Sequence, residues 1–135
     1  MFLLDTNIAS EIVKRTPDAK VMVRLNGETA ASLHISSVTV FELRFGAARS
    51  AKPASLWGRI QRDIISRFQA LPFTDQDALT AAGLMAPLVG SGQHLALQDI
   101  WLAGVPFGRD LTFVMRNRRD FDRVPGLKVE NWFES

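Results

Sequence analysis

The chain has 135 residues, which suits one domain with a single buried core. Hydrophobic residues make up 47% and charged residues 22%, which excludes a disordered or fibrous protein. There is no cysteine, which excludes disulfide frameworks, thiolate metal sites and cysteine nucleophiles. No apolar run approaches the roughly 20 residues of a membrane span, and the run at residues 1–4 meets Asp5 too early to be a signal peptide. We therefore expect a cytoplasmic protein that does not bind a membrane.

Short apolar runs alternate with longer segments of helical periodicity. This alternation predicts an α/β fold with a short, mainly parallel central sheet, and a single domain over residues 1–135. In chain order we expect a strand at 2–4, helices at 7–14 and 17–25, a strand at 33–35, helices at 39–48 and 53–68, a strand at 71–73, helices at 75–88 and 99–103, and strands at 111–115 and 127–129.

Several residues predict where these helices begin and end. Thr16-Pro17 is typical of a helix start, with the threonine as N-cap, and Asp75 is predicted to cap a later helix. Pro87 predicts a kink or an early end of that helix. Gly104 and Pro106 are predicted to limit the helix that follows it.

Four acidic residues are predicted to gather at one edge of the sheet. Asp5 ends the first strand, and Glu42 lies in the first turn of the helix after the second strand. Asp99 begins a later helix, and Asp120 follows the strand at 111–115. Ligands of open parallel sheets bind at the carboxyl ends of the strands. Clustered carboxylates repel one another unless a cation lies between them, and Mg²⁺ and Mn²⁺ take oxygen ligands. The pattern therefore predicts a divalent-metal site that activates water against a phosphodiester.

The same acids also have ordinary structural interpretations as caps, turns or helix-start charges, and function is favoured most clearly at Asp5. Four other acids are expected at surface, cap or turn positions: Asp63, Asp75, Asp77 and Asp110. Trp101 is expected to point away from Asp99, toward the core or a dimer contact, with stacking on a base as the less favoured role.

The chain from residue 109 onward is rich in basic residues: Arg109, Arg116, Arg118, Arg119, Arg123 and Lys128. A solvated face accounts for such a run, and a surface that binds phosphate is the functional alternative.

The order of these motifs resembles the PIN-domain ribonucleases, specifically the VapC/FitB-type toxins of bacterial type II toxin–antitoxin pairs. The resemblance covers nearly the whole chain and implies a three-layer α/β/α fold. It is carried by Leu4-Asp5-Thr6-Asn7, by residues 36–46 around Glu42, by 98–103 around Asp99, by 116–121 around Asp120, and by 124–132.

By position, the resemblance implies a Mg²⁺- or Mn²⁺-dependent endoribonuclease. The residues that it assigns are the catalytic acids Asp5, Glu42, Asp99 and Asp120, of which the first three bind the metal, and the supporting residues Thr6, Asn7 and Asn117. From their charge, Arg116, Arg118 and Arg119 are the candidates for binding the RNA backbone. The resemblance also implies a homodimer and a cognate antitoxin that inhibits the enzyme. The resulting hetero-oligomer would bind promoter DNA only through the antitoxin.

Two departures from the family pattern leave alternatives open. Met115 stands where a Thr or Ser is usual, and Asp110 stands where a Gly is usual. The missing hydroxyl favours one alternative, a catalytically weak PIN-like module whose acids dock an arginine of a partner. A second alternative, a phosphohydrolase of the haloacid-dehalogenase type, also has an Asp after its first strand. That family needs a second Asp where this chain has Asn7.

Overall fold

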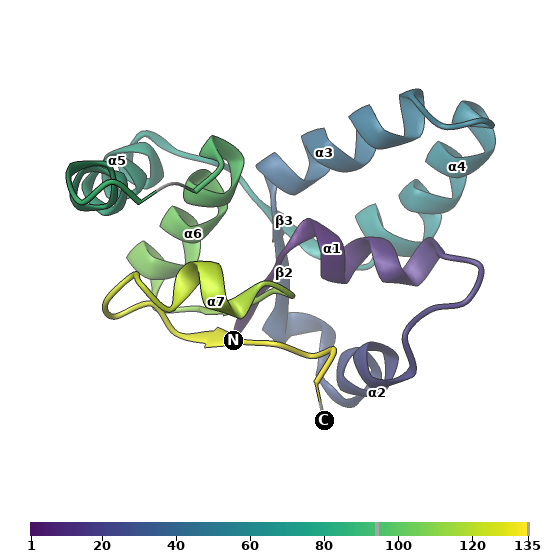
Figure 1. The fold of residues 1–135 in the computed structure, drawn as a ribbon. Helices are drawn as coiled ribbons and strands as arrows, with labels where there is room; N and C mark the ends of the chain where they lie inside the picture. The colour runs from purple at the N-terminus through teal and green to yellow at the C-terminus, as the bar shows by residue number, and fades with distance from the viewer. Residues whose placement is uncertain (94, 135) are drawn as a thin grey trace.

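The computed structural model describes residues 1–93 and 95–134 as a five-stranded sheet with helices on both faces (Figure 1). In chain order the elements are β1 Phe2–Leu4, α1 Thr6–Ala9, a 3-10 helix Ser10–Val13, α2 Ala19–Gly27, a 3-10 turn Ala30–Ser32, β2 Leu33–Ser36, α3 Ser37–Ala48, α4 Pro53–Ile60, a π-helical turn Gln61–Ile65, β3 Gln69–Leu71, α5 Asp75–Gly90, α6 Leu97–Arg109, β4 Thr112–Val114, α7 Arg118–Phe121 and β5 Val129–Glu130.

The sheet has the strand order β3-β2-β1-β4-β5, and every neighbouring pair is parallel. β1 lies in the centre, where Phe2 is in register with Leu33 of β2 and with Thr112 of β4. The carboxyl ends of all five strands therefore lie at one edge. The predicted α/β class and the mainly parallel sheet are confirmed.

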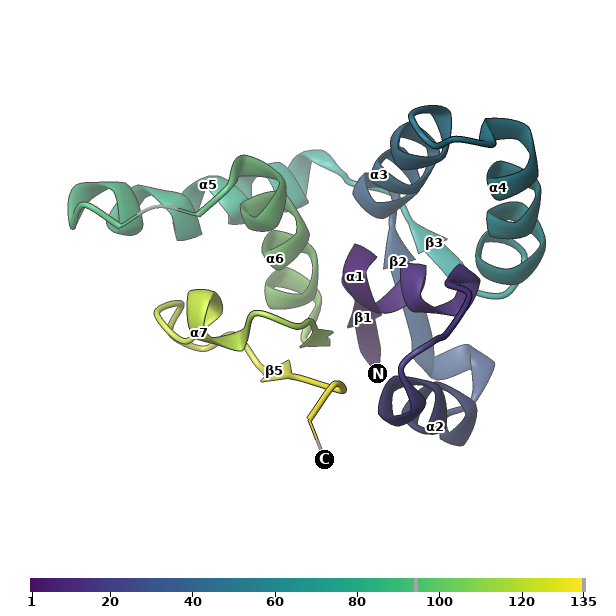
Figure 2. The ribbon, with the colours of Figure 1, turned by 45° about the vertical axis from the view of Figure 1, so that its right-hand side comes forward.

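Successive residues of the central strand enter two separate cores on opposite faces of the sheet. Leu4 belongs to a core formed with α1–α4, while Leu3 and Phe113 belong to a core formed with α6 and α7. Both leucines are fully buried, as expected for a parallel sheet covered on both faces. Figures 1 and 2 show α1–α4 on one side of the sheet and α5–α7 on the other, which confirms the three-layer arrangement. None of the helices in the described residues is long and apolar enough to cross a membrane.

The first two helices are present, but the second begins later than predicted. The predicted helix at 7–14 appears as α1 and the 3-10 helix after it. α2 begins at Ala19, because Asp18 caps it by accepting a hydrogen bond from the Val21 backbone N–H at 3.1 Å. The prediction of Thr16-Pro17 as the helix start is therefore wrong. The Asp18 carboxylate, one turn before an apolar stripe, is the cap that the chain uses.

Two strands differ from the predicted ranges at their ends. The strand predicted at 71–73 ends at Leu71, because Pro72 has no N–H to donate to the ladder. The strand predicted at 127–129 begins two residues later as β5. Before it, the chain turns at Gly126, whose φ of +82° is a left-handed conformation suited to glycine.

Both proline-containing helices continue past the residues that were predicted to end them. α5 runs through Pro87, and α6 runs through Gly104 and Pro106. The two helices pack closely, and an added Cβ at Gly104 would lie 2.9 Å from the Cβ of Ala81. Pro106 is itself buried. Tertiary packing here outweighs local helix propensity, so these predicted helix ends are wrong.

An ion pair ties the start of α5 to the end of α6. Thr74, rather than the predicted Asp75, caps α5 in a capping box with Asp77. Arg109 donates to Asp77 Oδ2 at 2.7 Å and to the Pro72 carbonyl at 2.9 Å. Burial would raise the pKa of Asp77, but hydrogen bonds from Arg109 and from Thr74 hold it below its ordinary value. Asp77 is thus a cap residue as predicted, and it is also a buried carboxylate with a cation partner.

The close contact between α5 and α6 predicts opposite changes in the free energy of unfolding for two glycine-to-alanine substitutions. Gly104→Ala should lower the free energy of unfolding by about 1–3 kcal/mol, because its Cβ would meet Ala81 and the Asp77 carbonyl, which lies 3.1 Å away. Gly83→Ala on α5, where nothing lies within 4 Å of the new Cβ, should raise it by up to about 1 kcal/mol. Urea denaturation of both variants checks this. A gain in both variants would contradict the close approach of the helices.

Candidate functional site

The four predicted acids lie on four elements that meet at the carboxyl edge of the sheet. Asp5 follows β1 directly, and its backbone N–H donates to the Val114 carbonyl of β4 at 2.8 Å. Glu42 lies on α3, which begins immediately after β2. Asp99 lies in the first turn of α6, and Asp120 lies in α7 after β4, rather than in the loop that was predicted there. All four side chains are partly buried.

Burial and like charge raise the pKa values of three of these carboxylates. Burial raises the pKa of Asp5 to about 7, and the charges of Asp99 and Glu42 contribute to the rise. The pKa of Glu42 is raised by burial and by the charge of Asp99, and the pKa of Asp99 is raised by burial and by the charge of Asp120. The acids therefore form a connected chain of like charges, which raises the free energy of the metal-free site.

Two threonine hydroxyls support Glu42 in this site. Thr6 Oγ1, at the start of α1, donates to Glu42 Oε1 at 2.8 Å and lies 3.0 Å from Thr39 Oγ1. Since the Thr6 hydroxyl has only one proton, Thr39 donates to Thr6. This chain of hydrogen bonds opposes the rise in the pKa of Glu42. Thr6, a predicted supporting residue, is thus hydrogen-bonded to one of the predicted acids.

Thr39 is a site residue that sequence reasoning missed. It is fully buried, although it is polar, and it lies one helical turn before Glu42. The spacing of three residues places both on one face of α3. A threonine three residues before a candidate acid is the signal that would have identified it.

The other predicted supporting residues lie at the rim. Asn7 is exposed, and its backbone N–H, like that of Thr6, opposes the rise in the pKa of Asp5. Asp5 itself makes no capping hydrogen bond with its side chain. Asn117 is exposed at the N-terminal boundary of α7. Both asparagines remain predicted site residues.

A basic groove lies beside Asp120. It has a volume of about 350 Å³, and its lining includes Arg116, Asn117, Arg118, Arg119 and Asp120. The three arginines are exposed, and Arg118 lies 3.6 Å from Asp122, the residue directly after α7. The structure therefore brings together the predicted RNA-binding residues and the predicted fourth acid.

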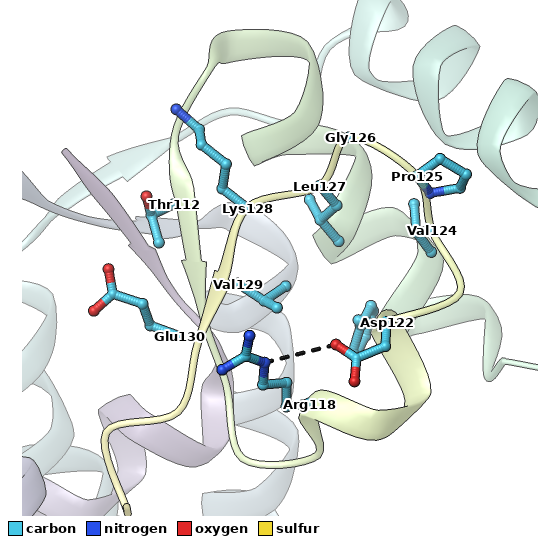
Figure 3. A pocket seen from close by; sticks show the side chains of 11 residues that line it. Thr112, Arg118, Asp122, Val124, Pro125, Gly126, Leu127, Lys128, Val129 and Glu130 are labelled. Atoms are coloured by element: carbon cyan, nitrogen blue, oxygen red, sulfur yellow. Dashed lines mark ion pairs between the residues drawn. The ribbon is translucent and has the colours of Figure 1, made fainter. Parts of the chain in front are cut away.

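A second polar pocket contains none of the four acids. It has a volume of about 570 Å³ and lies between α7, β4 and the chain around β5. Figure 3 shows Arg118 and Asp122 paired at one end of it and Lys128 at the other. Lys128 pairs with Asp110 at 2.7 Å, so its charge is already compensated. The pocket is not the candidate active site.

The two departures from the family pattern have structural consequences. Met115 is 1% exposed and packs in the core shared with α6 and α7, so this position contributes to stability. Asp110 has a φ of 55° and ends α6 in the left-handed conformation, which explains why glycine is usual there. His34 is buried, with Nδ1 3.3 Å from the Phe2 carbonyl, and is structural.

The predicted acids could bind a hard divalent cation, because each of them offers carboxylate oxygens as ligands. Within residues 1–93 and 95–134, however, no three histidine, aspartate or glutamate side chains stand as a ready-made metal cluster. Mg²⁺ is usually held by one or two carboxylates, with waters and substrate phosphates completing its shell. The spread of the acids fits such an open site.

Comparison with known proteins gives consistent matches over the whole chain. The family model described as PIN domain matches residues 2–127. The tRNA(fMet)-specific endonuclease VapC of Salmonella typhimurium is 33% identical over 97% of each chain. The FitAcB structure from Neisseria gonorrhoeae superposes with a TM-score of 0.91 at 27% identity over both full chains. The DNA-bound VapBC structure from Salmonella typhimurium gives 0.86 at 32% identity over 97% of each chain.

The raised pKa of Asp5 predicts a pH-dependent gain in stability from Asp5→Asn. In the folded protein Asp5 titrates near pH 7, against 3.8 for an ordinary aspartate, so the folded state binds more protons between these values. Wild-type stability therefore falls as pH rises through this window. At about pH 8 without metal, the variant should be more stable by about 2–4 kcal/mol, at ~1.4 kcal/mol per pKa unit.

Urea denaturation with EDTA, from about pH 4 to pH 8, measures this gain. Asp122→Asn, at the exposed C-cap of α7, is the control and should show no such pH-dependent gain. An equal effect of Asp5→Asn at both ends of the range would show that burial and repulsion do not act on this carboxyl.

Proposed function

The chain belongs to the PIN domain family, and from this premise we propose that it is a metal-dependent endoribonuclease toxin inhibited by a cognate antitoxin. The observation that carries the proposal is the convergence of four acids from β1, α3, α6 and α7 at the carboxyl edge of the sheet. Their mutual repulsion is relieved only by a cation or by protonation. A nuclease site of this design would therefore be stabilised by the metal that it needs.

Asp5, Glu42 and Asp99 are the residues that would hold Mg²⁺ or Mn²⁺. A bound cation supplies Lewis-acid stabilisation of the charge that develops on the phosphate, and it activates water. Asp5 is held at the end of a central strand, so its carboxylate is positioned by the sheet. The Thr6 hydroxyl donates to Glu42 and opposes the rise in its pKa. Asp120 lies beside the basic groove and would act as a fourth acid near the phosphate.

The RNA backbone would follow the basic groove on α7. Arg116, Arg118 and Arg119 place positive charge next to the acids, where the phosphates flanking the cleaved bond would lie. The guanidinium of Arg116 lies 4.6 Å above the Phe133 ring, which limits its motion.

The proposed partners, an antitoxin and promoter DNA, rest on the complexes that related proteins form. The Salmonella VapBC structure is a complex bound to DNA. For this chain we propose an antitoxin that covers the acids and a toxin–antitoxin hetero-oligomer built on a homodimer. Promoter DNA would contact the antitoxin, because the basic groove of this chain adjoins its own active site. Cytoplasmic location remains a prediction from the sequence.

Purified chain, freed of any partner, should cleave RNA with Mg²⁺ or Mn²⁺ and not with EDTA. Asp5→Asn should reduce cleavage by more than roughly 100-fold, the scale for losing a group that stabilises transition-state charge. Asp75→Asn, exposed at the start of α5, is the matched control and should cleave normally. Calorimetric titration with Mn²⁺ shows whether binding depends on Asp5. A folded chain that neither cleaves RNA nor binds metal would instead be a partner-docking module.

The basic groove predicts a salt-dependent loss of RNA affinity. The variant carries Arg116→Ala, Arg118→Ala and Arg119→Ala together. It should bind single-stranded RNA more weakly, and the slope of log affinity against log salt should decrease in magnitude by up to about 2, at ~0.7 for each phosphate that is no longer neutralised. Fluorescence anisotropy at several salt concentrations measures both quantities.

The control removes the same charge from the face formed by α1–α4. It carries Arg15→Ala, Lys52→Ala and Arg62→Ala, all at exposed positions. An unchanged affinity and slope in the groove variant, or equal changes in both variants, would show that the groove does not guide RNA.

A further inference from the structure

An apolar pocket lies on α3 and α6, the helices that carry Glu42 and Asp99, and none of the four acids lines it. It has a volume of about 590 Å³ and is lined by Ser37, Val38, Phe41, Phe73, Gln98 and Trp101. The residues come from the starts of α3 and α6 and from the segment between β3 and α5. Three of these six residues are aromatic, two are polar and one is aliphatic.

The pocket and the acids share the same two helices. Phe41 directly precedes Glu42 on α3, and Gln98 directly precedes Asp99 on α6. These helices contact each other. The pocket therefore lies on the two helices that carry Glu42 and Asp99, whereas the basic groove adjoins Asp120 on α7. An RNA strand with a phosphate at the acids would have the arginines of the basic groove near Asp120. It would have the aromatic pocket on the helices of Glu42 and Asp99.

The aromatic rings of this pocket are held in place and exposed. Phe41 is 62% exposed, and its ring stacks in parallel on Phe45 with centroids 6.0 Å apart. Trp101 is 38% exposed, and its ring packs at a tilt against Phe73, 6.1 Å between centroids. Trp101 thus lines a surface pocket instead of entering the core, which corrects one of the two places predicted for it. Fixed aromatic faces in solvent are platforms for a planar ligand.

The polar groups of the pocket match the edge of a base. Ser37 Oγ accepts a hydrogen bond from the Phe73 backbone N–H at 2.9 Å, so its own proton remains able to donate. Gln98 is exposed and carries both an amide donor and an acceptor. A purely aliphatic partner would leave these groups without hydrogen bonds, while a nucleobase has a flat apolar face and a polar edge.

We propose that this pocket holds one unstacked nucleobase of the RNA, next to the phosphate at the acids, with Trp101 and Phe41 as stacking platforms and Ser37 and Gln98 at its edge. The proposal rests on the ribonuclease function proposed above and gives it a base-binding subsite. The pocket would add affinity that does not depend on salt, and it would set which nucleotide lies beside the cleaved bond.

The test is binding of a fluorescein-labelled single-stranded RNA of about ten nucleotides, with Asp5→Asn in every chain to prevent cleavage. Trp101→Ala should weaken binding roughly 5- to 100-fold, the range for losing one base–aromatic stack, by the same factor at low and high salt. Trp101→Phe should restore most of the affinity, which separates stacking from a folding defect. Phe107→Ala, an exposed aromatic on α6 outside the pocket, should bind like the parent.

Unchanged affinity in Trp101→Ala would overturn the proposal. Light scattering of the same samples tests another occupant, because a loss of dimer in Trp101→Ala would show that a second copy of the chain covers the pocket. A loss of antitoxin binding with RNA binding intact would assign the pocket to that partner. Both results overturn the base-binding subsite.

Cleavage by the corresponding chains with Asp5 intact separates this proposal from the nuclease proposal. If Trp101→Ala cleaves RNA as fast as the parent, the base-binding subsite is contradicted and the nuclease proposal stands. If RNA binding depends on Trp101 but the chain cleaves no RNA with any metal, the pocket binds RNA and the nuclease proposal is contradicted.

Discussion

The position of β1 is the constraint on which the site depends. This strand is paired on both edges, and its last two residues are buried on opposite faces of the sheet. The ladder to β4 extends one residue beyond the strand, because the Asp5 N–H donates to the Val114 carbonyl. Asp5 therefore cannot withdraw from the other acids without breaking the centre of the sheet. Rigid placement of one carboxylate is what turns a set of acids into a site.

That rigidity has an energetic cost in the metal-free protein. Asp5 is largely removed from water and faces the charges of Glu42 and Asp99, so its ionised form is disfavoured. A fold selected only for stability would replace one of these acids or move it into solvent. Instead, the Thr39–Thr6–Glu42 hydrogen bonds favour the ionised form of one acid next to the others. Like charges maintained by such support are typical of a functional site rather than of a structural one.

The local sequence predicts the elements of the fold better than their ends. Apolar runs and strand-to-helix alternation are sufficient for the parallel sheet and for the acids at its carboxyl edge. The ends of α5 and α6 are not predictable in this way, because Gly104 and Pro106 are normally helix breakers. Both residues remain helical because α5 and α6 pack at short range and because Arg109 forms an ion pair with Asp77. Such contacts join residues far apart in sequence, and no single window contains them.

The site was predictable to a similar degree, and for similar reasons. Asp5, Glu42, Asp99 and Asp120 follow from element order alone, since each lies just after a strand or near the start of a helix. The depth of their burial and their mutual repulsion do not follow from it. Thr39 was missed because its role appears only when α1 is placed against α3. The apolar pocket was missed because its walls come from three separate segments.

Under the proposed function, three surfaces would bind the RNA by different physical interactions. The groove on α7 would attract the phosphate backbone by charge, which salt screens. The aromatic pocket would stack on a base, an interaction that salt affects little. The acids would repel the backbone until a cation neutralises them. An RNA strand held by the groove and by the pocket, but without metal, would therefore have phosphates next to carboxylates that repel them. Metal binding and productive placement of the phosphate are then expected to be one coupled event, since each removes a charge that opposes the other.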